Sequence, residues 1–79
     1  MNQKLYEIIA GVMEVPVSQI NDESNPETIE NWDSFNGLVL VDKLEEAYNI
    51  KFELAEIIET NSVKDIKKGL FKHGVSVDD

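Results

Sequence analysis

Asp33 and Ser34 are the neighbouring residues whose types point most directly to chemistry. A serine hydroxyl can act as a nucleophile, as the acceptor of a transferred group, or as a helix cap. Nucleophilic catalysis by serine needs an oriented base and an oxyanion hole, which Asp33 alone cannot supply. His73 is the one imidazole in the chain, and no acid that would orient it is evident. We therefore do not expect an autonomous hydrolase.

The residues after Asp33 predict an amphipathic helix from Ser34 to Asn49. At about 100° per residue, one side of this helix collects the core residues, which are Gly37, Leu40, Val41, Leu44, Ala47 and Tyr48. The other side carries Phe35, Val39, Asp42 and Glu46. Ser34 thus begins the helix, where unpaired backbone N–H groups and the helix dipole favour a negatively charged group. The Asp-Ser dipeptide alone is a weak motif, because both residues are common helix caps.

Three further helices are predicted around this one. The first spans roughly residues 3–14, from the helical spacing of Leu5, Ile8, Ile9 and Val12. A short helix over LAEIIE would be anchored by Leu54, Ile57 and Ile58. The last lies in NSVKDIKKGLFKHG, with Val63, Ile66 and Leu70 at helical spacing, Ser62 and Asp65 as a capping pattern, and Gly74 as a stop.

The segments between the helices are predicted to be irregular but anchored. The long loop over residues 15–32 is rich in Pro, Asn, Ser, Asp and Glu, and we expect it to be pinned by Val17, Ile20 and Ile29. Loops of this length in compact domains usually have a function. An extended connector follows the helix that starts at Ser34, with buried anchors at Tyr48, Ile50, Phe52 and Leu54.

The sequence therefore predicts an all-α fold, a four-helix bundle with three longer helices and one short helix. We expect one domain over residues 1–79, with residues 75–79 as a flexible tail. The predicted core consists of Leu5, Ile8, Ile9, Val12, Leu40, Val41, Leu44, Ile57, Ile66 and Leu70.

Four smaller features carry expectations of their own. Trp32 is predicted to be a hydrophobic staple that holds the loop against the following helix. Gly37 suggests close approach of another segment, and His73 is placed to interact with a helix C-terminus. The basic side chains of the last helix are expected to form a solvated face, made up of Lys64, Lys67, Lys68 and Lys72.

Composition narrows the classes of partner. The formal net charge is −9 and the pI is about 4.4, which disfavours nucleic acid and anionic membrane and favours basic protein surfaces. There is no cysteine, no ordered set of metal ligands, and no apolar run long enough to insert in a membrane. We expect a cytoplasmic monomer without a dedicated metal site.

The order of these features resembles that of the acyl carrier protein family, and the resemblance covers essentially the whole chain. It is carried by Asp33-Ser34-Phe35 at the start of an acidic, apolar helix, followed by LEEAYNIKF, a short helix and a last helix. The resemblance implies a freestanding carrier with 4′-phosphopantetheine, derived from coenzyme A, attached to Ser34 by a phosphopantetheinyl transferase. Asp33 would flank the site as a recognition residue, and cargo would ride as a thioester on the thiol of the arm.

Partner enzymes would then dock beside Ser34. We expect acyl- or aminoacyl-loading ligases and downstream synthases or transferases with basic patches to contact Phe35, Leu38, Val39, Asp42, Glu45 and Glu46. In the family pattern an acidic residue often stands five positions after the serine and an apolar one eight positions after it. Here the two positions hold Val39 and Asp42, so the order is reversed. This reversal argues against a carrier that serves the housekeeping enzymes of fatty-acid synthesis.

Three readings of function stay open from the sequence. The first is an acyl carrier of fatty-acid or polyketide biosynthesis, and the second is a D-alanyl or other aminoacyl carrier, because Phe35 after the serine fits that branch as well. The third is an unmodified acidic interaction module, which would need the apolar and acidic surface but not the hydroxyl of Ser34.

Overall fold

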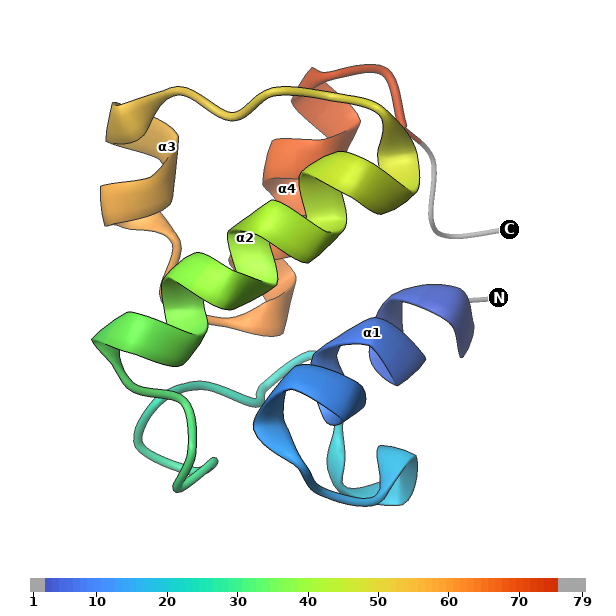
Figure 1. Cartoon of the computed structure of the whole chain (residues 1–79), viewed down its shortest axis with the longest axis vertical. Helices are drawn as coiled ribbons and strands as arrows, with labels where there is room; N and C mark the ends of the chain where they lie inside the picture. Colours follow the sequence, from blue (N-terminus) through green and yellow to red (C-terminus); the bar gives the residue numbers. More distant parts are fainter. Residues whose placement is uncertain (1–2, 76–79) are drawn as a thin grey trace.

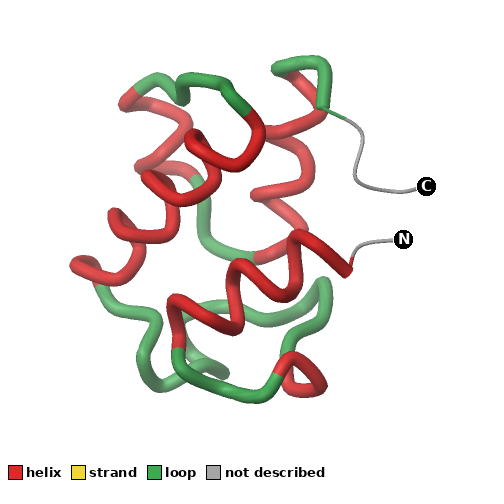
Figure 2. The backbone as a smooth tube through the Cα atoms, turned by 45° about the vertical axis from the view of Figure 1, so that its right-hand side comes forward, coloured by secondary structure: helices red, strands yellow, loops and turns green. Residues whose placement is uncertain are grey.

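The computed structural model describes residues 3–75, and within them the chain forms helices and connecting segments without a strand (Figures 1 and 2). The helices are α1 (Gln3–Met13), the 3-10 helix η1 (Val17–Gln19), α2 (Ser34–Tyr48), α3 (Leu54–Glu59) and α4 (Val63–Lys72). The all-α prediction, with three longer helices and one short one, is confirmed. Of the predicted tail, residues 76–79 lie outside the described residues.

The three longer helices end by the same device. A residue just beyond each helix takes the left-handed conformation, with φ of 59° at Glu14, 55° at Asn49 and 83° at Gly74. The next residues donate a backbone hydrogen bond to the carbonyl five positions earlier and pack against the core: Val15, Ile50 and Val75. This bond and the apolar contact that accompanies it define the Schellman motif. The predicted stop at Gly74 is confirmed.

The core lies where α1, α2 and α4 meet the long loop. Its buried side chains include the predicted Leu5, Ile9, Leu40, Leu44, Ile66 and Leu70. Four predicted core residues are only half-buried, namely Ile8, Val12, Val41 and Ile57. The loop adds Ile20, Ile29 and Trp32, and the helices add Ala10, Met13 and Val63. Side chains of the loop thus form part of the core of this small domain, together with those of the three longer helices.

Three predicted apolar anchors are wrong. Val17 is exposed, and in α3 the side chains of Leu54 and Ile58 are 72% and 69% exposed. A helix of six residues has too few turns to bury a whole apolar face, so α3 contacts the rest of the protein on one side only. Ile57 is the predicted anchor of α3 that does turn inward, where it lines a cavity.

The long loop is docked on the first turn of α4. The backbone N–H groups of Val63 and Lys64 donate to the carbonyls of Ser24 and Asp22, at 3.0 and 3.1 Å. Ser62 caps the same turn by accepting from the N–H of Asp65, as predicted. The loop therefore satisfies donors that an isolated helix would leave to water.

Lys67 is not part of a solvated face, contrary to our prediction. Its side chain is 11% exposed, and its Nζ contacts Asp22 Oδ1 and Tyr6 Oη, while Tyr6 Oη donates to the same Asp22 oxygen. Although burial opposes it, hydrogen bonding to Asp22 holds the pKa of Lys67 above its usual value. Hydrogen bonds from Lys67 and Tyr6 lower the pKa of Asp22. Across neutral pH both groups stay charged, and the cluster ties α1, the loop and α4 together.

Replacing Lys67 with Met should lower the free energy of unfolding by about 1–2 kcal/mol at pH 7, because Asp22 loses a charged hydrogen-bond partner. Lys68→Met removes the same charge from the exposed neighbouring position and should stay within about 0.5 kcal/mol of the parent. Urea denaturation of the two variants measures the difference. Equal effects would mean that the cluster contributes no more than a surface lysine.

The two glycines that face aromatic rings should respond differently to a methyl group. A Cβ at Gly37 would lie 3.9 Å from Trp32 Nε1, an ordinary contact, so the predicted close approach does not demand glycine there. Gly37→Ala should raise the free energy of unfolding by about 0.5–1 kcal/mol through helix propensity. Gly69→Ala should gain less or lose stability, because its Cβ would lie 3.2 Å from Phe52 Cε1. If thermal or urea unfolding shows that Gly69→Ala is more stable than Gly37→Ala, the result would contradict these contacts.

Candidate functional site

Ser34 is the first residue of α2, and its side chain is exposed. Asp33 caps the helix from an extended conformation, and its Oδ1 accepts a hydrogen bond of 2.8 Å from the N–H of Asn36. The carbonyl of Asp33 accepts the first intrahelical bond, from Gly37, also at 2.8 Å. Asp33 is therefore committed to holding the helix start, and it leaves the Ser34 hydroxyl at the surface in the positive field of the first turn.

Hydrogen bonds connect the start of α2 to the end of α1. The side-chain amide of Asn36 donates to the carbonyl of Asn31 at 2.7 Å, and the amide of Asn31 donates to the carbonyl of Met13 at 2.6 Å. These bonds fix the loop on both sides of the serine position. The sequence does not reveal these roles of Asn31 and Asn36, because an asparagine side chain, in a loop or in the first turn of a helix, gives no sign of which carbonyl it will meet.

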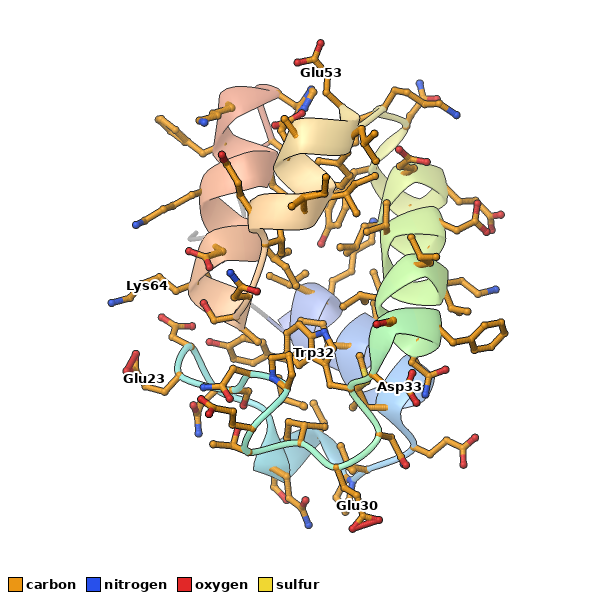
Figure 3. The ribbon with its side chains drawn as sticks, turned by 90° about the vertical axis from the view of Figure 1, so that its left-hand side faces the viewer. Glu23, Glu30, Trp32, Asp33, Glu53 and Lys64 are labelled. Atoms are coloured by element: carbon orange, nitrogen blue, oxygen red, sulfur yellow. The ribbon has the colours of Figure 1, made fainter. Side chains whose placement is uncertain are left out.

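Trp32, the residue before Asp33, is buried beneath the start of α2. Its ring is buried and lies near Gly37, one turn into α2, while Asp33 stands beside the first turn of the helix (Figure 3). A hydrophobic staple also needs an apolar side chain at the fourth helical position, and Gly37 has none, so the staple stays a prediction. The predicted role of Trp32 in holding the loop is supported by its burial. The ring anchors the chain immediately before the exposed serine.

A cavity of about 550 Å³ opens next to Ser34. It passes along α2 by Leu38, Val41 and Leu44 and reaches Ile57 of α3 and Ile66 of α4. Most of these lining side chains are apolar, and Ser34 and Asp33 bring polar groups to one part of the wall. The volume lies in the range of ordinary small-molecule sites.

The predicted partner-facing residues fall into different environments. Phe35 is 73% exposed, and Leu38, Asp42 and Glu46 are exposed as well. Val39 is half-buried toward α1. Glu45 turns toward the connector after α2: its Oε2 accepts from the N–H of Phe52 at 2.8 Å, and its side chain is 17% exposed. The acids at the surface of this helix are therefore chiefly Asp42 and Glu46.

Glu56 and His73 hold α3 against the end of α4. The distance from His73 Nε2 to Glu56 Oε1 is 3.0 Å, and the imidazole meets the ring of Phe52 edge-on, with centroids 5.4 Å apart. Two hydrogen bonds lower the pKa of Glu56. The larger effect comes from the backbone N–H of Glu53, and the next from the side chain of His73. His73 does stand at the C-terminus of α4, as expected, but its contact with α3 was not foreseen. This contact supports the wall of the cavity that contains Ile57.

Residues 3–75 contain neither a cluster of metal-ligating side chains nor a helix that could span a membrane. No group of three or more His, Cys, Asp or Glu side chains there could hold a metal ion. None of the helices in the same range has the length and apolar character needed to cross a membrane.

The chain matches the model of a known protein family. A protein-family model described as "Phosphopantetheine attachment site" matches residues 3–70, which include every helix except the last two residues of α4. No curated protein matches the chain. An exposed serine at a helix start, beside an apolar cavity, has the chemistry that a phosphodiester-linked arm requires.

The lowered pKa of Glu56 gives a pH-dependent prediction. A carboxyl group with a depressed folded-state pKa stabilises the fold above its unfolded-state pKa, and this contribution is lost as pH falls through the folded-state value. Glu56→Gln should therefore show a smaller loss of stability than the parent between neutral pH and about pH 3. Thermal midpoints measured across this range test it. Glu59→Gln changes an exposed residue of the same helix and is the control; its thermal midpoint should fall with pH as that of the parent does. If the thermal midpoint of Glu56→Gln falls as steeply as that of the parent, the prediction is contradicted.

Proposed function

Because the chain belongs to the phosphopantetheine attachment site family, we propose that it is an acyl carrier protein with its prosthetic group attached through Ser34. Family members carry 4′-phosphopantetheine covalently, and the chain is a carrier rather than a catalyst. The observation that carries the assignment to Ser34 is its exposed hydroxyl on the first turn of α2, beside the cavity of about 550 Å³.

The residues around Ser34 suggest how the attachment works. The Ser34 oxygen would attack the phosphorus of coenzyme A that carries the pantetheine arm. The pyrophosphate P–O bond would break, adenosine 3′,5′-bisphosphate would leave with the bridging oxygen, and the serine would lose its proton. Asp33 caps the helix through Oδ1 and has no imidazole beside it in sequence, so Asp33 alone does not form the oriented base and oxyanion hole that activation of a serine needs. The base and the groups that activate the phosphate must therefore come from the phosphopantetheinyl transferase. The first turn of α2 would then favour the negative charge of the phosphodiester.

Once attached, the arm supplies a thiol on which an acyl group is held as a thioester. The apolar cavity beside Ser34 supports a hydrophobic acyl cargo over a D-alanyl or other charged aminoacyl group, because burying an ammonium group among Leu38, Val41 and Ile66 would be costly. Fatty-acid and polyketide intermediates share this apolar character. Both pathways therefore remain within the proposal.

Partner enzymes are proposed to approach the exposed end of α2. Phe35 and Leu38 offer apolar contacts on either flank of the serine, and Asp42 and Glu46 offer negative charge to basic patches on loading and synthase enzymes. The net charge of −9 would speed such encounters at low ionic strength. We propose that this exchange takes place in the cytoplasm with the carrier as a monomer.

Intact mass spectrometry tests the proposal directly. After incubation of the unmodified protein with coenzyme A and a broad-specificity phosphopantetheinyl transferase, the parent should gain the mass of one phosphopantetheine. Ser34→Ala should gain none, because the acceptor oxygen is absent. Ser18→Ala, which removes an exposed serine in η1, is the matched control and should be modified like the parent.

The same measurement identifies the alternatives. A folded parent that stays unmodified would favour the unmodified interaction module, and modification of Ser34→Ala would place the arm elsewhere. Protein isolated from its producing cells can be weighed with its thioester intact. A hydrocarbon acyl group on the thiol would support the proposed cargo, and an amino acid would contradict it.

A further inference from the structure

A second hollow, of about 610 Å³, lies between α1 and α2. It begins at Phe35, directly after Ser34, and follows the stripe of α2 that includes Val39, Lys43 and Glu46. None of its lining residues also lines the cavity beside Leu38 and Val41. Helix α2 thus separates two concave surfaces that meet near the serine, and one of them can be covered by a protein while the other holds cargo.

The floor of this α1–α2 groove is open and apolar. Ile8 and Val12 of α1 and Ala47 of α2 line it, and all three are half-buried. Gly11 lies between Ile8 and Val12 in sequence, and a Cβ built on it would meet nothing within 4 Å. A glycine inside an exposed helix costs about 1 kcal/mol relative to alanine. Its presence here leaves room for an apolar side chain from another protein.

The rim of the groove carries charge, with Glu14 and Glu46 as acids and Lys43 as a base. Glu14 occupies the left-handed position that ends α1, with φ of 59°, where glycine is favoured and a side chain costs about 1 kcal/mol. The fold therefore tolerates a carboxylate at this rim against the local conformational preference. Together with the net charge of −9, the two rim acids suit a partner surface rich in Lys and Arg.

We propose that the α1–α2 groove docks the phosphopantetheinyl transferase. An apolar side chain of the enzyme would enter beside Phe35, while basic groups would face Glu14 and Glu46. This occupant is favoured because the groove starts one residue from Ser34, so an enzyme bound there has the hydroxyl within its reach. The inference rests on the proposed function, because it requires Ser34 to be the modified residue.

The test is the kinetics of modification of the full chain with coenzyme A and a broad-specificity phosphopantetheinyl transferase. Gly11→Leu fills the floor of the groove, and Glu14→Gly removes the rim charge while relieving the left-handed conformation. Gly11→Leu should raise KM for the carrier about tenfold, and Glu14→Gly about threefold, with kcat within about twofold of the parent. Both variants should be at least as stable as the parent, so misfolding does not explain the loss.

Glu53→Gln is the matched control for charge. It removes one negative charge at the far end of the molecule from Asp33 (Figure 3) and should leave KM unchanged. If the parent is modified and Gly11→Leu and Glu14→Gly keep its KM, the docking site is overturned while the carrier function stands. If KM is unchanged and only kcat falls, the groove is likewise not a docking site. If the folded parent is never modified, the proposed function fails and the inference fails with it.

A second copy of the chain is the competing occupant. Sedimentation velocity of the parent over a range of concentrations should show one monomeric species. A concentration-dependent dimer that Gly11→Leu abolishes would assign the groove to self-association and overturn docking of the transferase.

Discussion

The burial of Trp32 at the start of α2 is the constraint on which the site depends. The ring enters the core immediately before two exposed residues, so the chain must change from interior to surface within a single residue. Asp33 makes that change possible, because its carboxylate satisfies the N–H of Asn36 and starts the helix at once. Ser34 is consequently exposed, while the helix start beside it is held by the hydrogen bonds that Asp33 accepts from Asn36 and Gly37.

The long loop has a structural role that its composition hides. It contributes buried Ile20 and Ile29 to the core and supplies carbonyls to the first turn of α4. Its Asp22 joins Tyr6 and Lys67 in a polar cluster, and its Asn31 bonds the end of α1. In a domain this small, a segment whose one regular element is the 3-10 helix η1 thus helps to complete the core and to fix the helices.

Helix α2 separates two concave surfaces. Leu38 and Val41 line the cavity beside Ser34, whereas Phe35 and Val39 line the groove shared with α1. The short helix α3 contributes Ile57 to the cavity wall and is held at its other side through Glu56 and His73. With Leu54 and Ile58 exposed, α3 buries little apolar surface of its own, and the contact between Glu56 and His73 helps to hold it in place.

The sequence by itself determined the four α-helices, the N-caps of α2 and α4, and the serine at the head of α2. These features depend on signals that act within one or two turns: apolar spacing for α1 and α4, Asp33 and Ser62 as caps, and Gly74 as a stop. The resemblance to acyl carrier proteins added the phosphopantetheine, and the family match agrees with it.

Tertiary structure alone decided which side of each helix is covered. Lys67 is half-buried and Lys68 is exposed, Leu54 is exposed and Ile57 turns inward, and Glu45 faces the connector whereas Glu46 faces solvent. Helical periodicity places successive residues about 100° apart around the helix axis, but it does not say which side of the helix another segment covers. Whether a side chain is then buried depends on how a distant segment packs over it, and no local signal in the sequence encodes that packing.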